Sequence, residues 1–282
     1  MSTFGRFKYV VDHGFFNAID TEEKAYWLGF IAADGCIKRN TSTLEVTLKR
    51  ADEEHLYELK RVLKTDAPIR HGAVHGYPTA RFVITSPQIA TDLARYNVVP
   101  GKSLTYDFPE KLPRQYFWAF LRGYFDGDGS ICLRRTHNRI WSLIGTQSFL
   151  EFVMDYFSGE LGNKPSQFRQ VGKKTFELQY SGRPALKLLY NVFYCSGGYA
   201  LARKRFKWLE VIKEINYRTP CTVLPLEVAK KAYELHQQGM PMVKLAKIFN
   251  CSDTGIAKAF RRNGWRILTA RPRRKQKEKG WQ

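Results

Sequence analysis

Two similar segments, far apart in the chain, constrain the fold more than any other feature of its 282 residues. AYWLGFIAADG occupies residues 25–35, and AFLRGYFDGDG occupies residues 119–129. Each is an apolar run of helical length that ends in Asp-Gly, so each predicts a buried helix. The repeat indicates that the chain contains two related halves.

Local signals mark the ends of these two helices. Asp20 is the predicted N-cap of the first helix, with Glu23 three residues later as its partner in a capping box. Gly35 and Gly129 follow the two aspartates, and glycine readily takes the left-handed conformation found at helix ends. We expect both glycines to stop their helices in that conformation.

Small residues recur four positions apart within each segment: Gly29 and Ala33, then Gly123 and Gly127. This spacing puts them on one helix face, where small side chains let two helix backbones approach closely. Packing of the two helices on each other would then bring Asp34 and Asp128 together at the C-terminal ends.

Two carboxylates in that place repel each other and face the negative ends of the helix dipoles. Divalent cations would remove both costs, and hard oxygen ligands favour Mg²⁺. The alternative is a pair of solvated Asp-Gly turns, which does not account for the recurrence on two glycine-spaced helices.

After each segment the hydrophobic period changes from helical to alternating. In TLEVTLK, Leu44, Val46 and Leu48 fall on one face, which is typical of a strand with one buried side. The order helix, hairpin, helix, hairpin, helix follows through both halves, and an extra helix closes the second. The fold class predicted is therefore α+β.

The charge balance indicates a polyanionic partner. The chain has 46 Lys and Arg against 26 Asp and Glu, a net charge of +20, and nucleic acid is the expected partner. A merely basic protein is the alternative, but the charge is uneven: residues 220–282 hold 14 basic and 4 acidic residues. The five cysteines show no C-x-x-C spacing and are expected to be reduced thiols.

The two segments resemble the paired signature helices of the LAGLIDADG homing endonucleases, in the single-chain form with two motifs. The motifs would be residues 27–35 and 121–129, and the resemblance covers about residues 20–213. It implies a pseudo-two-fold duplicated αββαββα core with two DNA-facing antiparallel sheets. It also implies Mg²⁺-dependent phosphodiester hydrolysis that makes a staggered double-strand break in a long asymmetric target. Such cleavage would spread the intron or mobile element that encodes the protein.

The same resemblance assigns roles to particular residues. Asp34 and Asp128 match the metal-binding acids, helped by the carbonyl groups of Ala33 and Gly127. Mn²⁺ is expected to substitute for Mg²⁺, and Ca²⁺ to bind without supporting cleavage. The further catalytic candidates are a basic residue in each half, from PGKSL and LARKRF, and a water-positioning side chain in GTQSF: Lys102, Lys204 and Gln147.

Two departures from the family pattern make the halves unequal. Ala32 stands where the family often has an acid, while the second motif keeps Asp126. Leu48 lies near the place where a counterpart of Gln147 would be sought. We therefore expect the two strands of the target to be cut at different rates.

The polar face of each hairpin would read DNA bases, and a mixture of Arg, Glu, Gln and Thr suits direct readout. An ordinary solvated sheet face is the alternative. The candidates are Lys38, Thr43, Glu45, Thr47, Lys49, Arg70 and Arg81 in the first half, and Ser130, Arg134, Arg169, Thr175, Glu177 and Gln179 in the second. The facing of residues 140–144 stays open because both of their faces are apolar.

Beyond residue 220 the pattern is one of short helices, which resembles helix-turn-helix modules, with a helical dimerisation module as the alternative. Val243, Leu245, Ala246, Phe249, Ile256 and Phe260 are the predicted core, and Ser252 the predicted cap of the last helix. The residues expected to face DNA are Thr254, Lys258, Arg261 and Arg262.

The predicted organisation has six parts: an N-terminal extension (1–19), a first half (20–106), a linker (107–113), a second half (114–216), a helix-turn-helix domain (217–270) and a basic flexible tail (271–282). With no secretion signal or membrane span expected, we expect a cytoplasmic monomer without an obligate protein partner, encoded by a bacterium or phage. A non-cleaving transcription regulator on the same core is the main alternative, and an RNA-splicing maturase is another.

Overall fold

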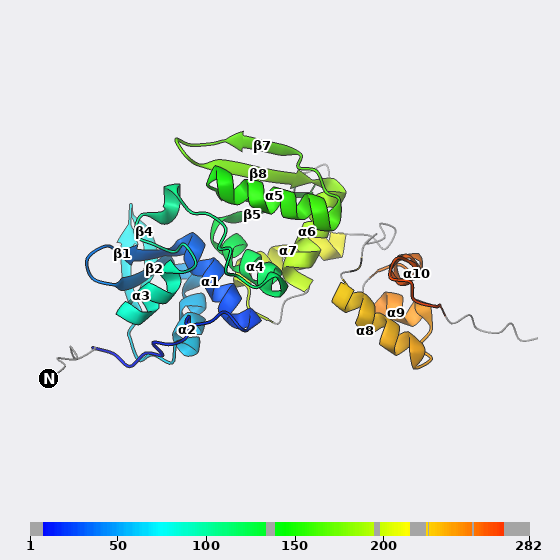
Figure 1. The fold of residues 1–282 in the computed structure, drawn as a ribbon, viewed down its shortest axis with the longest axis horizontal. Coiled ribbons are helices and arrows are strands. Elements are labelled where there is room, and N and C mark those ends of the chain that lie inside the picture. The colour runs from blue at the N-terminus through cyan, green and yellow to red at the C-terminus, as the bar shows by residue number, and fades with distance from the viewer. Residues whose placement is uncertain are drawn as a thin grey trace, which may run out of the picture. The chain divides into compact units, whose positions relative to one another are not determined.

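The computed structural model describes residues 8–133, 139–194, 198–214, 224, 226–249 and 251–267. The chain forms two compact units, Met1–Glu214 and Ile215–Gln282 (Figure 1). Of the residues singled out above, Arg134 and the tail 271–282 lie outside the described residues.

The larger unit contains the same series of elements twice. The first series is α1 (Glu22–Asp34), β1 (Gly35–Lys38), β2 (Thr43–Lys49), α2 (Glu53–Val62), β3 (Arg70–Val74), β4 (Tyr77–Thr85) and α3 (Pro87–Ala94). The second is α4 (Phe117–Asp128), β5 (Gly129–Leu133), β6 (Arg139–Gly145), α5 (Gln147–Leu161), β7 (Gln167–Gln170), β8 (Phe176–Ser181) and α6 (Gly182–Tyr194), followed by α7 (Ala202–Glu214).

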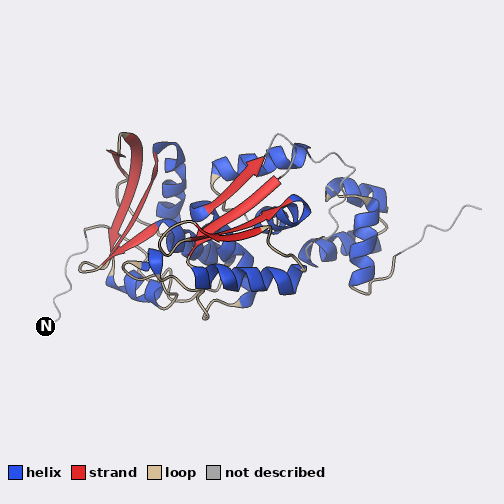
Figure 2. Ribbon diagram, turned by 90° about the horizontal axis from the view of Figure 1, so that it is seen from above, coloured by secondary structure: helices blue, strands red, loops and turns tan. Residues whose placement is uncertain are grey.

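Each series builds one antiparallel sheet (Figure 2). Each sheet has four strands, in the orders β1-β2-β4-β3 and β5-β6-β8-β7. The strand order is the same in both halves, as a duplication requires. The predicted α+β class, with a duplicated αββαββα core and two antiparallel sheets, is confirmed.

The two repeated helices, α1 and α4, pack directly on each other through their glycines. A Cβ added to Gly29 would overlap the carbonyl oxygen of Phe120, and one added to Gly123 would overlap the carbonyl oxygen of Tyr26. One added to Gly127 would overlap the methyl group of Ala33. The helices therefore meet backbone against backbone, as the spacing of small residues predicts.

Two details at the helix ends differ from the sequence prediction. Thr21, not Asp20, is the N-cap of α1, and its hydroxyl accepts a hydrogen bond from the Lys24 amide. Gly35 (φ −80°) and Gly129 (φ −94°) are extended rather than left-handed, so the expectation for them is wrong. Each glycine is the first residue of a strand, where a Cβ would collide with the preceding helical turn.

The sheets follow the predicted alternation. Leu44, Val46 and Leu48 of β2 are buried, while Thr47 and Lys49 are exposed. Strand pairing also settles the face that the sequence left open. Trp141 pairs with Tyr180 and Leu143 with Leu178, all four fully buried. The alternate residues Ile140, Ser142 and Ile144 therefore belong to the outer face.

The smaller unit contains three short helices in its described part: α8 (Leu226–Gln237), α9 (Met242–Ile248) and α10 (Asp253–Arg262). The side chain of Ser252 caps α10, as predicted, by accepting a hydrogen bond from the Gly255 amide at 2.9 Å. Of the predicted core, Leu245, Phe249, Ile256 and Phe260 are buried, whereas Val243 is 60% exposed. Among the described residues, no helix is both long and apolar enough to span a bilayer.

Candidate functional site

The close contact of α1 and α4 brings the two motif aspartates together at the helix ends. A Cβ on Gly127 would lie 3.2 Å from Cγ of Asp34 and 3.3 Å from its Oδ2. Any larger residue at that position would push the carboxylate away. The glycine at residue 127 therefore gives Asp34 its place beside the next residue along α4, Asp128.

Both carboxylates are held in an environment that disfavours their charge. Burial, reinforced by the negative charge of Asp128, raises the pKa of Asp34 from 3.8 to about 6. Burial also raises the pKa of Asp128, partly offset by the charges of Lys102 and Lys204. The ionised form of the pair is therefore unfavourable, and nearby positive charge stabilises it.

The two predicted lysines lie at the C-terminal ends of the same helices and are almost fully buried. Lys102 Nζ donates to the Ala33 carbonyl oxygen of α1 at 3.1 Å. Lys204 Nζ donates to the Asp126 carbonyl oxygen of α4 at 2.7 Å and also to that of Phe125. A cation at a helix C-terminus opposes the negative end of the dipole, so each lysine compensates the acid beside it.

Burial governs the pKa of both lysines as well. It lowers the pKa of Lys102 against the attraction of Asp128 and Asp34. It lowers the pKa of Lys204 to about 8, against the attraction of Asp126. Burial thus brings the pKa of Lys204 nearer to neutral pH than that of an exposed lysine.

The donor set at the helix ends fits a hard divalent cation with few protein ligands. The described residues contain no cluster of three or more His, Cys, Asp or Glu side chains suited to hold a metal. Two carboxylates remain, and Mg²⁺ commonly takes one or two carboxylates and completes its shell with water and phosphate oxygens. Of the two backbone carbonyl groups that the resemblance adds, that of Ala33 already accepts a hydrogen bond from Lys102.

A buried polar chain beside the aspartates was not foreseen from the sequence. The Tyr26 hydroxyl donates to Asp126 Oδ2 at 2.7 Å and lies 2.8 Å from Nε2 of His55. The same carboxylate oxygen accepts the Leu201 amide at 2.7 Å. Asp126 thus ties α1 and α4 to the segment that carries Lys204. Its occurrence opposite Ala32 in the repeat was the only sequence signal for this role.

Gln147 is the first residue of α5, and its amide donates to Glu151 at 2.8 Å on the exposed surface. Strand pairing identifies its counterpart in the first half. Val46 corresponds to Leu143, because each pairs with the first glycine of its sheet. Counting four residues onward from each places Arg50, not Leu48, opposite Gln147. Arg50 forms an ion pair with Glu53 at 2.9 Å.

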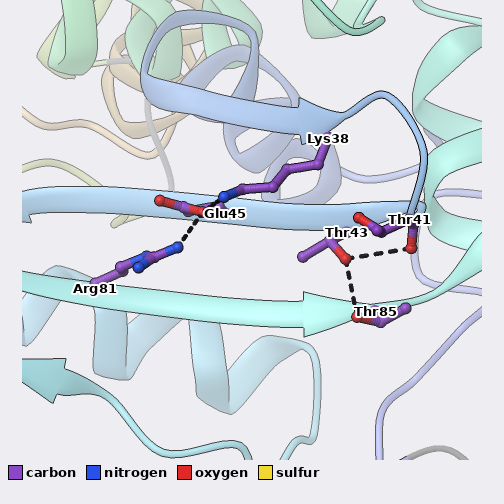
Figure 3. A network of polar contacts seen from close by, with 6 residues as sticks. All are labelled: Lys38, Thr41, Thr43, Glu45, Arg81 and Thr85. Carbon is purple, nitrogen blue, oxygen red and sulfur yellow. Dashed lines mark hydrogen bonds and ion pairs between the residues drawn. The ribbon is translucent and has the colours of Figure 1, made fainter.

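Most of the base-reading candidates in the first half share the outer face of its sheet. Glu45 accepts from Lys38 at 2.8 Å and from Arg81 at 2.5 Å (Figure 3). Thr47, Lys49 and Arg70 are exposed. Thr43 differs, because it is only 8% exposed and its hydroxyl contacts the Thr41 carbonyl and the Thr85 hydroxyl.

Of the described candidates in the second half, Ser130, Arg169, Glu177 and Gln179 lie on the corresponding face of the second sheet. Ser130 is exposed at the start of β5. Arg169 pairs with Glu177 across β7 and β8 at 2.8 Å, and Gln179 lies on the same face. Thr175 precedes β8, in the turn where its carbonyl accepts the amides of residues 171 and 172. In the smaller unit the four candidates on α10 are all exposed: Thr254, Lys258, Arg261 and Arg262.

Comparisons with known proteins give distant likenesses. No protein-family model matches the chain. The replication factor C small subunit of Methanocaldococcus jannaschii is 26% identical over 206 residues, which cover 71% of this chain. The chain spans only 11% of the length of that curated relative.

Three solved structures cover about two thirds of the chain. Meganuclease I-SmaMI, bound to uncleavable DNA, is 13% identical with a TM-score of 0.48, and covers 68% of this chain and 92% of its own. The LAGLIDADG homing endonuclease I-GzeII, in complex with its DNA target, is 14% identical with a TM-score of 0.46, over 68% and 90%. The LAGLIDADG homing endonuclease I-LtrWI, bound to target DNA, is 10% identical with a TM-score of 0.44, over 69% and 92%.

Proposed function

We propose that the chain is a LAGLIDADG homing endonuclease that cleaves a long, asymmetric DNA target. It would hydrolyse one phosphodiester bond in each strand, leave a staggered break, and so spread the intron or mobile element that encodes it. The observation that carries the proposal is the pair of half-buried aspartates on backbone-packed helices, each helix end bearing a buried lysine.

The chemistry follows from the charges at the helix ends. Asp34 and Asp128 would hold Mg²⁺, which supplies positive charge beside the scissile phosphate when bound. Lys102 and Lys204 keep further positive charge within electrostatic reach of both carboxylates. That charge would stabilise the extra negative charge of the phosphoryl group in the transition state. Burial also brings the pKa of Lys204 to about 8, nearer to neutral pH than that of an exposed lysine.

A non-cleaving regulator on the same core would have no use for this arrangement. Two half-buried carboxylates that repel each other destabilise a fold unless cations bind between them. A protein that only grips DNA would be more stable with neutral residues at both positions. The retention of both acids therefore favours an enzyme over a regulator, and the same reasoning favours it over a maturase without nuclease activity.

The remaining features of the proposal concern the partner and the setting. The net charge of +20 supports DNA as the polyanion. The smaller unit would act as a helix-turn-helix that adds contacts through the exposed face of α10. We propose a monomer, since both motif helices come from one chain, working in the cytoplasm of a bacterium or of a phage-infected cell.

The test is a search for new DNA ends. Purified protein is incubated with a randomised or genomic duplex library in Mg²⁺ and, in parallel, in Ca²⁺, and all new ends are sequenced. Recurrent staggered breaks in Mg²⁺ alone, lost in Asp34→Asn and Asp128→Asn, are expected. Asp20→Asn, which alters an exposed carboxylate just before α1, is the control and should cleave normally. Sequence-specific retention of DNA without new ends would instead identify a regulator.

A further inference from the structure

The two sheets can be compared position by position, because equivalent residues start both pairings. Gly35 of β1 pairs with Val46 of β2, and Gly129 of β5 pairs with Leu143 of β6. Counting outward from these pairs aligns every outer-face position of one sheet with a position of the other. The comparison shows whether the two halves offer DNA the same chemistry.

One row of side chains crosses three strands in each sheet at the same place. The first row consists of Thr47, Arg81 and Arg70, and the second row of Ile144, Glu177 and Arg169. The first row presents two guanidinium groups on neighbouring strands. The second row presents an aliphatic side chain, a carboxylate and one guanidinium group.

The guanidinium group of Arg81 in the first row is held in a fixed position. Glu45, one row away, accepts from Arg81 at 2.5 Å and from Lys38 at 2.8 Å (Figure 3). Burial alone would raise the pKa of Glu45, but the hydrogen bonds from both cations lower it, so this carboxylate stays charged. Arg81 remains 43% exposed, and its planar fork is therefore preorganised for an acceptor outside the sheet.

In the second row, two N–H groups of the one guanidinium group are bound by a carboxylate within the sheet, although that side chain is 55% exposed. Arg169 donates from both Nε and Nη2 to Oε2 of Glu177, at 3.0 and 2.8 Å. Ile144, beside Glu177, is 40% exposed although it is aliphatic. In the adjoining row, Gln179 pairs with Gln167, which puts two carboxamides side by side on the outer face.

These two surfaces suit different base pairs. A fixed Arg fork matches the O6 and N7 acceptors of guanine, a carboxamide matches N7 and N6 of adenine, and an exposed aliphatic group matches the methyl group of thymine. We propose that the two halves read half-sites of opposite composition: G·C pairs beneath the first row and A·T pairs beneath the second. The inference rests on the proposed function only in taking the outer sheet faces as the DNA-contacting surfaces.

The test compares two matched variants on a target selected by binding, so that it does not depend on cleavage. Full-length protein in Ca²⁺ is used to select bound duplexes from a random library, and the consensus is then varied one base pair at a time. Glu45→Gln releases Arg81 and is expected to lower the preference for G by about tenfold at one or two positions of one half-site. Glu177→Gln releases Arg169 and is expected to create a preference for G in the other half-site.

Each outcome decides a different point. Selected half-sites of equal composition, or variants that alter neither or both half-sites alike, would overturn the inference. A consensus of opposite composition in a protein that never cuts would support it while overturning the proposed nuclease activity. If no sequence is enriched, both the inference and the proposed function fail.

Discussion

At the scale of the residue, the candidate site is a set of charges that the fold holds at some cost. Asp34 and Asp128 are pressed together by a glycine contact, and two buried lysines at the helix ends compensate them. Asp126, two residues before Asp128, accepts the Leu201 amide at its carboxylate and Lys204 Nζ at its carbonyl oxygen, and so anchors the segment that carries Lys204. The same residues therefore affect both the chemistry of the site and the stability of the fold, and single substitutions can measure the two effects separately.

Replacing Asp34 should stabilise the protein in a pH-dependent way. The folded-state pKa of about 6 lies above the ordinary 3.8, so the stability that protonated Asp34 contributes is complete below pH 3.8 and is lost as the pH rises through 6. Asp34→Asn is expected to raise the free energy of unfolding by up to about 3 kcal/mol at pH 8, and by little at pH 4. Urea unfolding at both pH values measures the effect.

Two controls accompany that measurement. Asp20→Asn, on an exposed carboxylate, should give no gain at pH 8. Mg²⁺ should raise the melting temperature of the native sequence at pH 8 but not that of an Asp34→Asn, Asp128→Asn double variant. Equal stabilisation by Asp34→Asn at both pH values would contradict the electrostatic explanation.

Removal of the Tyr26 hydroxyl should reveal the strength of the buried polar chain. Tyr26→Phe leaves Asp126 Oδ2 without one of its donors, and the expected loss is about 1–3 kcal/mol of unfolding free energy. Tyr106→Phe is the matched control, because the Tyr106 hydroxyl is buried and has no hydrogen-bond partner among the described residues. A similar cost in both variants, measured by chemical denaturation, would mean that the chain of hydrogen bonds adds nothing.

At the scale of the element, the contact of α1 with α4 determines the architecture of the larger unit. Gly29 and Gly123 let each helix approach the carbonyl groups of the other, so the two halves are joined through backbone atoms. Strands β1 and β5 leave the helix ends directly through Gly35 and Gly129. The position of each sheet therefore follows from the position of its motif helix.

Adding one methyl group to this contact should disrupt it. Gly29→Ala places a Cβ 2.8 Å from the Phe120 carbonyl carbon and 2.9 Å from the Tyr124 amide nitrogen, and backbone atoms cannot move aside. The expected cost is about 3 kcal/mol or more. Gly159→Ala in α5, where nothing lies within 4 Å, should instead stabilise the protein by about 0.5–1 kcal/mol. If thermal unfolding showed Gly29→Ala to be more stable than Gly159→Ala, the close backbone contact of α1 and α4 would be ruled out.

The sequence was informative where a local pattern sets the structure. Spacing of small residues predicted the packing of α1 on α4, and alternation predicted the faces of β2. The sequence was less informative where contacts between residues far apart in the chain determine the structure. The facing of β6 required the pairing of Trp141 with Tyr180, and the polar chain joins Tyr26, His55 and Asp126, which no spacing rule connects. The extended conformation of Gly35 reflects the start of a strand, which a helix-end rule does not consider.

At the scale of the whole molecule, two compact units share an excess of positive charge. The larger unit holds the aspartates and both sheets, and the described part of the smaller one holds three short helices with an exposed basic face on α10. Residues 220–282 contribute 14 basic residues against 4 acidic ones. Phosphate contacts supply affinity in proportion to the cations engaged, whereas the proposed catalysis would depend on the helix ends.

Deleting residues 220–282 should therefore separate affinity from chemistry. The shortened protein is expected to bind its target more weakly and with a shallower dependence of log affinity on log salt, because fewer counterions are released. Cleavage at saturating protein should persist. Titrations at several salt concentrations, with single-turnover cleavage alongside, measure both properties, and complete loss of cleavage at saturation would contradict the expectation.

The backbone contact of α1 and α4 at Gly29 and Gly123 limits which parts of the two halves can change in sequence. At Gly29 and Gly123 the two halves meet through main-chain atoms, so this part of the contact depends little on the other side chains. Substitutions on the outer face of either sheet would leave this backbone contact unchanged. Thr47 of β2 opposite Ile144 of β6 is one such difference between the outer faces. A half taken from another chain should therefore pack against either half of this one, provided that it has a glycine at the position of Gly29 or Gly123.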